Sequence, residues 1–470
     1  MGLYNMTYGV KGRIFVLFVS LFILTLSATA GASAGASAEA VTASHVFVTV
    51  KDGHLYSGGS RLFIRGINYY PKGKVWDDFW SGFDAAEVRR DFGTIRMMGF
   101  NCVRIFLQYD SFGRENLDNG AAAKLSMVLS SAAFEGLRVI VTLFDRIDPR
   151  TFYSHWNYPK IDKHLESLVP LFSNDPAILC WDLKNEPDLD YRFNLNSSVV
   201  NDCISRMITK VRSLDANHLI TVGYLNPPPG QATAGCDILS FHFYAAAEKL
   251  PAAIDSAKFI AKGRPVLLEE FGFTTSGIRS FKVPANEAQE NYFSSVLASV
   301  LGGGIDGFFV WTLYDHPRDT KIEERERYFG MIGLNGSAKP ASKLVPKKMI
   351  ITRDPVRIAV YNDLEAGMSL EVLDISGNAV RTLAGAGRYS QGGHIFYWDL
   401  RDNDGRLAPR GEYLVMLRSG DISVSERVSV SAKDMRAAVF TISALILLAL
   451  SAYLVPFAKR LAGHGKGRRK

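Results

Sequence analysis

The feature that most constrains the fold is a regular alternation of short apolar runs and amphipathic helices between residues 46 and 335. Eight of the runs have the length and the composition of buried strands, and helical patterns separate most of them. These predicted strands are Phe63–Ile67, Cys102–Leu107, Arg138–Phe144, Ile178–Leu183, Leu219–Val222, Ile238–Phe243, Pro265–Glu269 and Gly307–Leu313. Eight βα units in one stretch of chain predict an α/β fold, a TIM (β/α)8 barrel over 46–335.

Local signals agree with this alternation. Asp84, followed three residues later by Glu87, is a capping box and predicts the start of a helix. Pro159 suits the first turn of a later helix. Before the first barrel strand, residues 45–66 contain the turn signals of a hairpin, which we expect to close the bottom of the barrel.

The composition changes after the barrel. Residues 336–349 are rich in Lys, Pro and Ser and are predicted to be a linker. Residues 350–432 alternate apolar and polar positions between Gly-rich turns, which predicts a small all-β sandwich. The stretch Asp402-Asn403-Asp404-Gly405 is too short for a calcium loop of the EF-hand kind, and we interpret it as a tight turn.

Both ends of the chain have the pattern of membrane-targeting segments. Residues 1–30 combine basic residues, a short apolar run and small residues, which is typical of a signal peptide; an uncleaved anchor is the alternative. An Ala/Gly/Ser-rich linker over 31–45 follows. Residues 437–458 carry no charge and are long enough to span a bilayer, and the basic tail over 459–470 should stay cytoplasmic. We therefore expect a single-pass protein of the cell membrane whose barrel is extracytoplasmic.

The charge and the cysteines exclude some classes of protein. The eight basic residues in the two end segments account for more than the whole net charge of +7, so the body is nearly neutral and no nucleic-acid partner is expected. Cys102 and Cys180 lie in strand-like runs and are expected to be buried thiols, whereas a pairing of Cys203 with Cys236 is left open. The spacing of Cys and His suggests no metal site, and no cofactor is expected.

In a barrel of this kind the chemistry takes place at the C-terminal ends of the strands. There the sequence places two carboxylic acids on nearly opposite strands, among basic, amide, histidine and aromatic residues. They are Arg104 on the second strand, Asn185 and Glu186 after the fourth, His242 and Tyr244 after the sixth, Glu270 after the seventh and Trp311 on the eighth. Two facing carboxylic acids with aromatic platforms are suited to the cleavage of a glycosidic bond.

These residues resemble the landmarks of glycoside hydrolase family 5 of clan A, the cellulase and mannanase family. Asn185-Glu186-Pro187 and Glu270-Phe271-Gly272 resemble its two carboxylate motifs. Arg104, His242-x-Tyr244 and Trp311 match its remaining landmarks in order, and the resemblance covers about residues 46–334. It implies a retaining glycosidase that needs no cofactor.

The resemblance also implies a role for each residue. Glu186 would be the general acid/base, and Asn185 would bond the 2-hydroxyl group of the sugar. Glu270 would be the nucleophile, which Arg104 keeps ionised by lowering its pKa and Tyr244 orients. The residues expected to bind the substrate or line its cleft are Arg104, Asn185, His242, Tyr244 and Trp311, with Trp311 stacked under the sugar.

Two adjacent glutamates compete for the position of the nucleophile. Neighbouring side chains of a regular strand point to opposite faces, so only one of Glu269 and Glu270 should face the mouth of the barrel. The resemblance places the nucleophile directly before the pair Phe271-Gly272, which selects Glu270. Glu269 is then expected to face the surrounding helices or to pair with a basic residue.

Other residues of the loops are harder to assign. Two or three of the loop aromatic residues could be stacking platforms for sugars, and the others should pack the loops. The candidates are Tyr69, Tyr70, Trp76, Trp80, Tyr153, Trp156 and Tyr224. The stretch IEERERY, residues 322–328, is interpreted as a solvated charged segment.

The predicted β domain has a resemblance of its own. Residues 380–420 are similar to the immunoglobulin-like domain of the flagellar hook-capping protein. The matching positions are Val380, Trp398, Asp399, Asp402, Asp404, Gly405, Gly411 and Tyr413. This domain is expected to be a spacer between membrane and enzyme, or a weak contact for a sugar or a partner.

Taken together, the sequence predicts a membrane-anchored, extracytoplasmic retaining glycoside hydrolase that acts on β-linked glucan or mannan. One alternative is a catalytically inactive barrel that binds surface polysaccharide. Another is a transglycosylase that remodels exported polysaccharide.

Overall fold

The computed structural model describes residues 46–193, 196–228, 230–276, 284–345, 347–352, 356–362, 365–419 and 422–431 of the chain. The predicted signal peptide (1–30), the linker 31–45, the predicted span 437–458 and the basic tail 459–470 lie outside these residues. Within the described ranges, no helix is long and apolar enough to cross a membrane.

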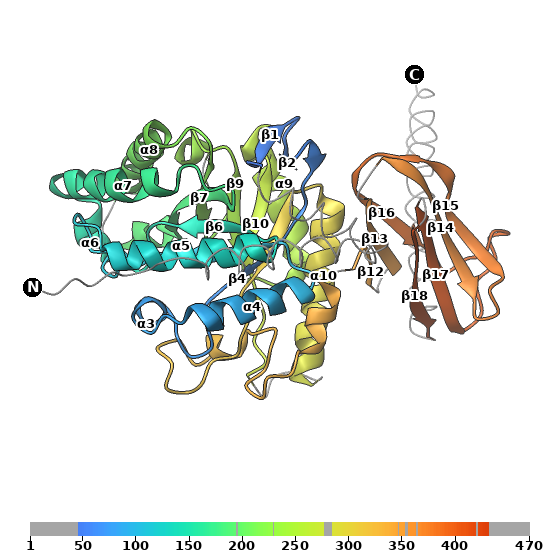
Figure 1. Ribbon diagram of the computed structural model, residues 1–470. Coiled ribbons are helices and arrows are strands. Elements are labelled where there is room, and N and C mark those ends of the chain that lie inside the picture. Colours follow the sequence, from blue (N-terminus) through green and yellow to red (C-terminus); the bar gives the residue numbers. More distant parts are fainter. Residues whose placement is uncertain are drawn as a thin grey trace, which may run out of the picture.

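Eight parallel strands form a closed barrel, which confirms the predicted fold of this part of the chain (Figure 1). Neighbours in sequence are neighbours in the barrel, from β4 round to β11 and back to β4. The strands are β4 (Ile64–Asn68), β5 (Cys102–Phe106), β6 (Arg138–Thr142), β7 (Ile178–Asn185), β8 (Leu219–Tyr224), β9 (Leu239–Phe243), β10 (Val266–Phe271) and β11 (Gly307–Val310).

Helices surround this barrel, and two short ones lie in its loops (Figure 1). The surrounding helices are α4 (Ala85–Met97), α5 (Asn119–Phe134), α7 (Tyr158–Phe172), α8 (Ser197–Leu214), α9 (Leu250–Ala261) and α10 (Ala285–Gly303). The short ones are α3 (Asp77–Ser81) and α6 (Pro149–Phe152).

The predicted hairpin closes the bottom of the barrel. Its strands are β1 (Thr49–Lys51), β2 (His54–Ser57) and β3 (Ser60–Arg61). Leu55 is fully buried among residues from the N-terminal ends of the barrel strands. The Arg138 guanidinium holds the hairpin from β6 by donating to the Val46 carbonyl and to Ser57 Oγ, both at 2.8 Å.

The helix signals are confirmed with one difference. The Asp84 carboxylate accepts a hydrogen bond from the Ala86 N–H and caps α4. In a capping box the Glu87 side chain would accept a hydrogen bond from the Asp84 N–H. Here Glu87 forms an ion pair with Lys74 at 2.7 Å instead. Pro159 lies in the first turn of α7, as predicted.

All four cysteines are buried free thiols. The prediction for Cys102 and Cys180 is therefore confirmed. The pairing of Cys203 with Cys236, which the sequence left open, does not occur in this structure.

The C-terminal part consists of two antiparallel sheets, which confirms its all-β class. One sheet is β12 (Met349–Thr352), β13 (Val356–Asn362) and β16 (Gly392–Trp398). The other has the order β15 (Ala379–Tyr389), β14 (Ala366–Asp374), β17 (Gly411–Ser419), β18 (Ile422–Val430). The two sheets share one apolar core, to which Ile358, Val360, Leu370, Val372, Trp398, Val415 and Leu417 belong. The immunoglobulin-like resemblance stays a prediction.

The stretch Asp402–Gly405 is a tight turn. The Gly405 N–H donates to the Asp402 carbonyl at 3.1 Å, and the Arg406 N–H donates to the Asp402 carboxylate at 2.8 Å. The carboxylate is thus used by the turn itself.

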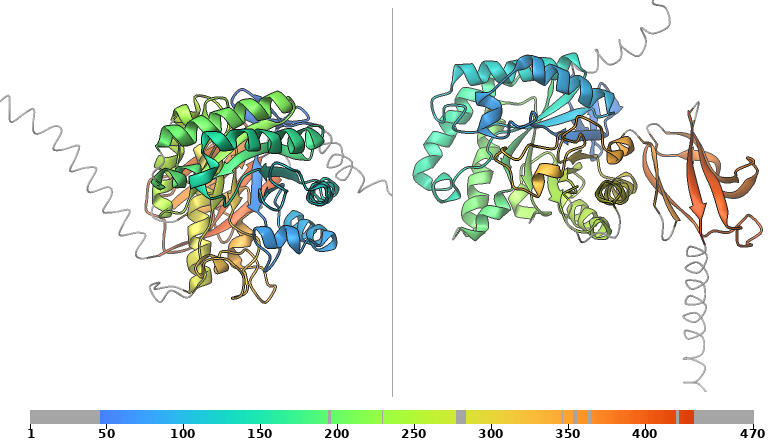
Figure 2. Two further views of the ribbon diagram at one scale, coloured as in Figure 1. Left: turned by 90° about the vertical axis from the view of Figure 1, so that its left-hand side faces the viewer. Right: turned by 90° about the horizontal axis from the view of Figure 1, so that it is seen from below.

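The sheet formed by β12, β13 and β16 lies against α10 of the barrel, and the other sheet lies on its far side (Figure 1 and the right-hand view of Figure 2). The rings of Phe63 and Tyr361 are 4.3 Å apart across this interface. The backbone of β16 approaches the end of α10 so closely that a Cβ atom on Gly393 would lie 1.4 Å from the Leu301 carbonyl oxygen. Ile350, Ala359 and Tyr361 therefore belong to the same apolar core as the barrel.

The predicted linker 336–349 is packed rather than free in its described part. Ala341 and Leu344, from the short 3-10 helix η6 (Pro340–Leu344), are buried. Lys339 donates to the Asp315 carboxylate at 2.6 Å in the loop after β11. The barrel and the sheet β12–β13–β16 therefore share one packed interface, and the role of the β domain as a spacer or as a weak contact stays a prediction.

We expect Gly393→Ala to destabilise the whole protein, because the backbone of α10 leaves no room for a methyl group. Overpacking of this kind costs about 1–3 kcal/mol. Gly385→Ala on β15 is the matched control, since nothing lies within 4 Å of its Cβ position. Thermal unfolding of the two variants checks this: equal melting temperatures would show that the interface can open without cost.

Candidate active site

The barrel brings all seven predicted site residues to the C-terminal ends of its strands. Arg104 lies on β5, Asn185 ends β7 and Glu186 follows it, His242 lies on β9 and Tyr244 just after it, Glu270 lies on β10, and Trp311 directly follows β11. Arg104 and His242 are buried behind the surface of the site. The other five line a cleft of about 800 Å³.

Glu270 is nearly buried and is held by two donors. Arg104 Nη1–H donates to its Oε1 at 2.5 Å, and the Tyr244 hydroxyl donates to its Oε2 at 2.8 Å. Burial raises the pKa of Glu270 above its ordinary value, while the charge of Arg104 lowers it. Arg104 thus acts in the predicted direction, but burial outweighs it.

Glu186 is presented by an unusual backbone. Its φ of 45° is in the left-handed region, and its N–H donates to the Gly223 carbonyl on β8 at 2.7 Å. Its Oε1 lies 2.9 Å from His242 Nδ1. Burial, reinforced by the negative charges of Asp188 and Asp145, raises the pKa of Glu186 to about 7. A carboxylic acid with this pKa can donate a proton near neutral pH.

The two carboxyl groups lie close together. One ligand atom each from Glu186, Glu270 and His242 lies within 4.8 Å of the other two. Three groups this close could also bind a metal ion, but their hydrogen bonds to each other and to Tyr244 and Arg104 account for the arrangement without one. A spacing of about 5 Å leaves no room for a water molecule between the carboxyl groups, and it is the spacing of retaining glycosidases.

The histidine of the site is neutral. His242 is almost fully buried, and burial lowers its pKa to about 4. Its Nδ1 lies 3.5 Å from Glu270 Oε2 as well as 2.9 Å from Glu186. A neutral imidazole between the two carboxyl groups can share a hydrogen bond with either of them without fixing a charge there.

Arg104 connects these groups below the cleft. Its Nη2 donates to Asp182 Oδ2 at 2.6 Å and to Asn185 Oδ1 at 2.9 Å, and its Nη1 donates to Asn68 Oδ1 at 3.1 Å. The amide oxygen of Asn185 already accepts a hydrogen bond from Arg104. The amide N–H₂ group of Asn185 is therefore the part that can donate to a sugar hydroxyl.

Asp182 is a site residue that the sequence analysis missed. Its carboxylate accepts hydrogen bonds from Arg104, from Thr142 Oγ1 at 2.7 Å and from the Gly223 N–H at 3.0 Å. The signal was a single acid within the buried run of β7, with a single arginine on a strand two places away. A buried charge is costly unless it is paired, so a buried acid and a buried arginine in one barrel are expected to form an ion pair.

The first of the two expected placements of Glu269, facing the helices, was wrong. The second, a pairing with a basic residue, is met by Arg104, whose Nε lies 3.8 Å from Glu269 Oε1. The pairing of β10 with both neighbouring strands shifts register around Leu268–Phe271, which is the mark of a β-bulge. The bulge lets Glu269 and Glu270 both point into the barrel. A Cβ atom on Gly223 would lie 2.8 Å from Glu269 Oε2, so Glu269 reaches across to β8.

The hydrogen bonds around Arg104 favour Glu269 as the carboxyl group that is neutral. Asp182, Glu269 and Glu270 are all buried around one guanidinium, and three buried anions would exceed its charge. Asp182 and Glu270 each accept several hydrogen bonds. Arg104 Nε is 3.8 Å from Glu269, and neither Glu269 oxygen has a close hydrogen-bond partner among the described residues. Burial and the charge of Asp182 raise the pKa of Glu269 well above its ordinary value.

The loop after β11 forms part of the cleft, and the interpretation of residues 322–328 as a solvated charged segment holds for Glu323, Glu324 and Arg325, which are exposed. Ile322 is buried, and Glu323, Arg325 and Glu326 line the cleft. Burial, with the charges of Glu323 and Glu186, raises the pKa of Glu326 to about 7. A third carboxylic acid therefore faces the site.

Most of the aromatic candidates are structural. Five of the seven are buried in the core: Tyr69, Tyr70, Trp80, Tyr153 and Tyr224. Trp76 lines the cleft, with the Arg146 guanidinium 3.8 Å from its ring. Trp156 is 65% exposed and lines a second pocket beside the cleft. Trp311 forms the floor, edge-on to Phe106 with ring centroids 5.9 Å apart.

Comparison with known proteins agrees with this geometry. A model of the family Cellulase (glycosyl hydrolase family 5) matches residues 74–314, about half of the chain. Mannan endo-1,4-beta-mannosidase A of Podospora anserina is 25% identical over 277 residues, which cover 46% of this chain and 72% of that protein. Mannan endo-1,4-beta-mannosidase 1 of Solanum lycopersicum is 24% identical over 348 residues, 58% of this chain and 85% of that protein.

Two solved structures share the fold. The exo-beta-1,4-mannosidase Op5Man5 from Opitutaceae bacterium strain TAV5 has a TM-score of 0.55 at 20% identity, covering 63% of this chain and 61% of that chain. A GH5_18 protein from Streptomyces cattleya, in complex with Manb1-4GlcNAc, has a TM-score of 0.52 at 19% identity, covering 60% and 78%.

We expect Glu269→Gln to make the protein more stable, and increasingly so as the pH rises above about 4.3, where Glu ionises in an unfolded chain. The pKa of Glu269 is higher in the folded protein than in the unfolded chain, so its contribution to the free energy of unfolding falls as the pH rises. Gln does not titrate, so the variant does not show this loss. Chemical denaturation between pH 4 and 8 measures the difference, with exposed Glu412→Gln as control. A variant less stable than the wild type at neutral pH would mean that Glu269 is an anion paired with Arg104.

Proposed function

The chain belongs to glycosyl hydrolase family 5 and is a glycosidase, and we propose that it cleaves β-linked polysaccharide with retention of configuration through Glu186 and Glu270. The observation that carries the proposal is the pair of carboxyl groups less than 5 Å apart, one with a pKa of about 7 and the other held by Arg104 and Tyr244. This is the arrangement that double displacement needs.

In the first step Glu186 donates its proton to the glycosidic oxygen while a Glu270 oxygen attacks the anomeric carbon. The bond between the anomeric carbon and the leaving oxygen breaks, and a glycosyl ester with Glu270 forms. The Arg104 and Tyr244 hydrogen bonds keep the attacking carboxylate in place. Asn185 is suited to bond the 2-hydroxyl group, and Trp311 to support the sugar ring.

In the second step Glu186 takes a proton from water, and the water oxygen attacks the anomeric carbon. The ester bond breaks and Glu270 regains its charge. Formation of the ester removes the negative charge of Glu270 from the vicinity of Glu186, which makes Glu186 a weaker base and allows it to remain ionised until water arrives. The same residue thus serves as acid and then as base.

For the substrate we propose β-1,4-linked mannan, with β-glucan as the second choice. The support is the pair of mannan endo-1,4-beta-mannosidases among the relatives, each matched over more than two thirds of its length. The barrel, and not the C-terminal sheets, carries the cleft, so the substrate is expected to bind the barrel alone.

We also propose that the enzyme is held outside the cytoplasm by residues 437–458. The support is the sequence: an uncharged run long enough for a bilayer, followed by a basic tail. Fractionation of cells that make the full chain, or a chain ending at 432, tests this. If the full chain and the shortened chain are recovered equally in the soluble fraction, residues 437–458 do not anchor the protein.

Glu186→Gln and Glu270→Gln should each lower kcat on mannan by several orders of magnitude, because either variant interrupts double displacement. On an aryl glycoside with a good leaving group, Glu186→Gln should still form the glycosyl ester, since no acid is then needed. Product analysis by NMR should show initial β-configuration. Binding without turnover in the wild type would favour an inactive polysaccharide-binding barrel, and longer products in the presence of acceptor sugars would favour a transglycosylase.

Activity should fall on the alkaline side with an apparent pKa of about 7, as Glu186 loses the proton it must donate. Asp188 is the charged neighbour that raises the pKa of Glu186 most. Asp188→Asn removes this charge, so the fall of activity on the alkaline side should move to lower pH. The pH dependence of kcat/KM for wild type, Asp188→Asn and the control Asp255→Asn on α9 measures the shift. An alkaline limb that is the same in all three would assign it to another group.

A further inference from the structure

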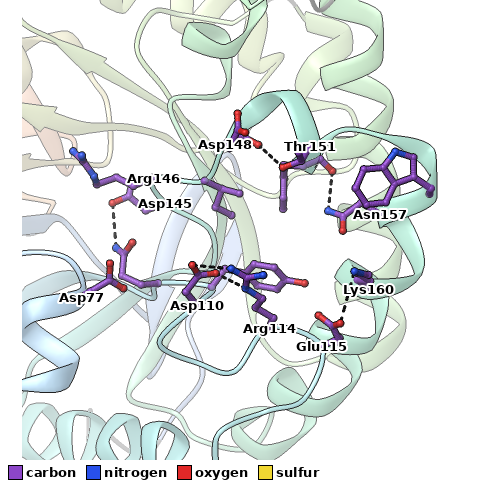
Figure 3. A pocket seen from close by; sticks show the side chains of 15 residues that line it. Asp77, Asp110, Arg114, Glu115, Asp145, Arg146, Asp148, Thr151, Asn157 and Lys160 are labelled. Atoms are coloured by element: carbon purple, nitrogen blue, oxygen red, sulfur yellow. Dashed lines mark hydrogen bonds and ion pairs between the residues drawn. The ribbon is translucent and has the colours of Figure 1, made fainter.

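Lys184 is a buried cation of the cleft that has no part in the reaction steps described above. It lies on β7, two residues before Glu186, and lines the cleft although it is only 4% exposed. Lysines are almost never buried unless they are paired, because an ammonium group is costly to remove from water. Lys160, in the pocket beside the cleft, shows the ordinary case: it is exposed and lies 3.8 Å from Glu115 (Figure 3).

An irregularity at the end of β7 brings Lys184 to the cleft. In a regular strand neighbouring side chains point to opposite faces. Here Lys184, Asn185 and Glu186 all line the cleft. The pairing of β7 with β8 shifts register between Asp182 and Asn185, and Glu186 has a left-handed φ of 45°. The chain thus departs from regular structure at the point where it places an ammonium group beside the acid/base.

The ammonium group of Lys184 contacts the chain on both sides of Glu186. Its Nζ donates to the Asn185 carbonyl, directly before Glu186, at 2.7 Å. The same Nζ lies 3.3 Å from Asp190 Oδ2, and Asp190 belongs to the 3-10 helix η2 (Pro187–Arg192) that directly follows Glu186. One side chain therefore ties together the two segments between which Glu186 is held.

Asp190 is itself fixed in place. It is buried and accepts a hydrogen bond from the Tyr153 hydroxyl at 2.7 Å. Tyr153 is buried and directly follows α6, the short helix near Asp148 and Thr151 in Figure 3. The ion pair thus connects the end of β7 to the loop after β6. Such a pair resists separation, because either partner alone would be an uncompensated buried charge.

The position of Glu186 makes such support necessary. A left-handed conformation of a residue other than glycine is strained and persists only where the surrounding structure enforces it. A general acid must also lie within hydrogen-bond distance of the oxygen that it protonates. A misplacement of about 1 Å can lower the rate by about 100-fold.

The charge of Lys184 also acts on Glu186. Burial and the charges of Asp188 and Asp145 raise the pKa of Glu186, whereas the charges of Arg104 and Lys184 lower it. A change at Lys184 should therefore be visible in the pH dependence of the steps that use Glu186.

We propose that Lys184 is a positioning residue of the reaction: together with Asp190 it fixes the chain on both sides of Glu186 and thereby the direction in which the Glu186 carboxyl group delivers its proton. The proposal rests on the proposed function and adds to it a residue that acts through Glu186. A step that needs Glu186 as an acid depends on Lys184, and a step that needs no acid does not.

The first test varies the leaving group. Lys184→Met keeps the length of the side chain and removes the ammonium group. On aryl glycosides of the sugar that the wild type cleaves, it should lower kcat/KM by about 10- to 100-fold when the leaving group is poor. When the leaving group is good, kcat/KM should stay within about twofold, because the glycosyl ester then forms without an acid. Lys124→Met on α5, which also loses a bond from Nζ to a backbone carbonyl, is the control.

The second test separates positioning from a merely structural role through the alkaline limb of kcat/KM. Lys184→Met should move this limb to higher pH by about 0.5–1 unit, since a cation that lowers the pKa of Glu186 is lost. Asp190→Asn removes a negative charge and should move it to lower pH. In Lys184→Met/Asp190→Asn the two shifts should nearly cancel. The double variant leaves no unpaired buried charge, so it keeps the leaving-group test valid if Lys184→Met alone does not fold.

The outcomes distinguish this inference from the proposed function. Equal losses with good and poor leaving groups, together with an alkaline limb that stays in place in the folded variants, would make Lys184 a structural residue and overturn the inference, while the proposed function stands. If the wild type cleaves none of the glycosides, the proposed function fails and this inference fails with it.

Discussion

The structure of the site depends on one buried cation. Arg104 is fully buried and gathers residues from β4, β7 and β10 around its guanidinium. Without Arg104, Asp182 and Glu270 would be buried anions with no counter-charge, which a folded protein does not tolerate. The same contacts position Asn185 and orient Glu270. Chemistry and folding therefore draw on the same interaction, and burial raises the pKa of the nearby Glu269, which disfavours a third anion there.

The reactive geometry is built from local departures from regular structure. A bulge in β10 turns two successive glutamates inward. Glu186, directly after β7, has a left-handed backbone conformation that directs its own side chain into the cleft. The glycine at position 223 on β8 leaves space for these side chains. A Cβ atom there would lie within 3.0 Å of Glu269, Arg104 and His242. The regular barrel outside the site provides the rigidity that holds these strained positions.

The C-terminal sheets share this rigidity. Tyr361 and Ile350 enter the apolar core of the barrel, and Gly393 brings β16 against the backbone of α10. A swing of this domain relative to the cleft would have to break these packing contacts. If the chain is anchored through its C-terminus, as proposed, the cleft keeps a fixed orientation to the sheets that precede the anchor.

Much of this protein follows from its sequence alone. The eight apolar runs with helices between them predict the barrel, because eight successive βα units are the pattern of the (β/α)8 fold. The order of Arg104, Asn185-Glu186, His242-x-Tyr244, Glu270 and Trp311 along those strands places them at one rim. The tertiary structure decided the rest. A sequence pattern assumes regular alternation along a strand, so it let only one of Glu269 and Glu270 face the mouth of the barrel, whereas the bulge turned both inward. Composition predicted that residues 322–328 are solvated, and part of the segment is exposed, but only the folded chain places Glu323, Arg325 and Glu326 along the cleft. Asp182 was missed as a partner of Arg104, although a lone acid in one buried run and a lone arginine in another were visible in the sequence, because no local pattern relates residues on different strands.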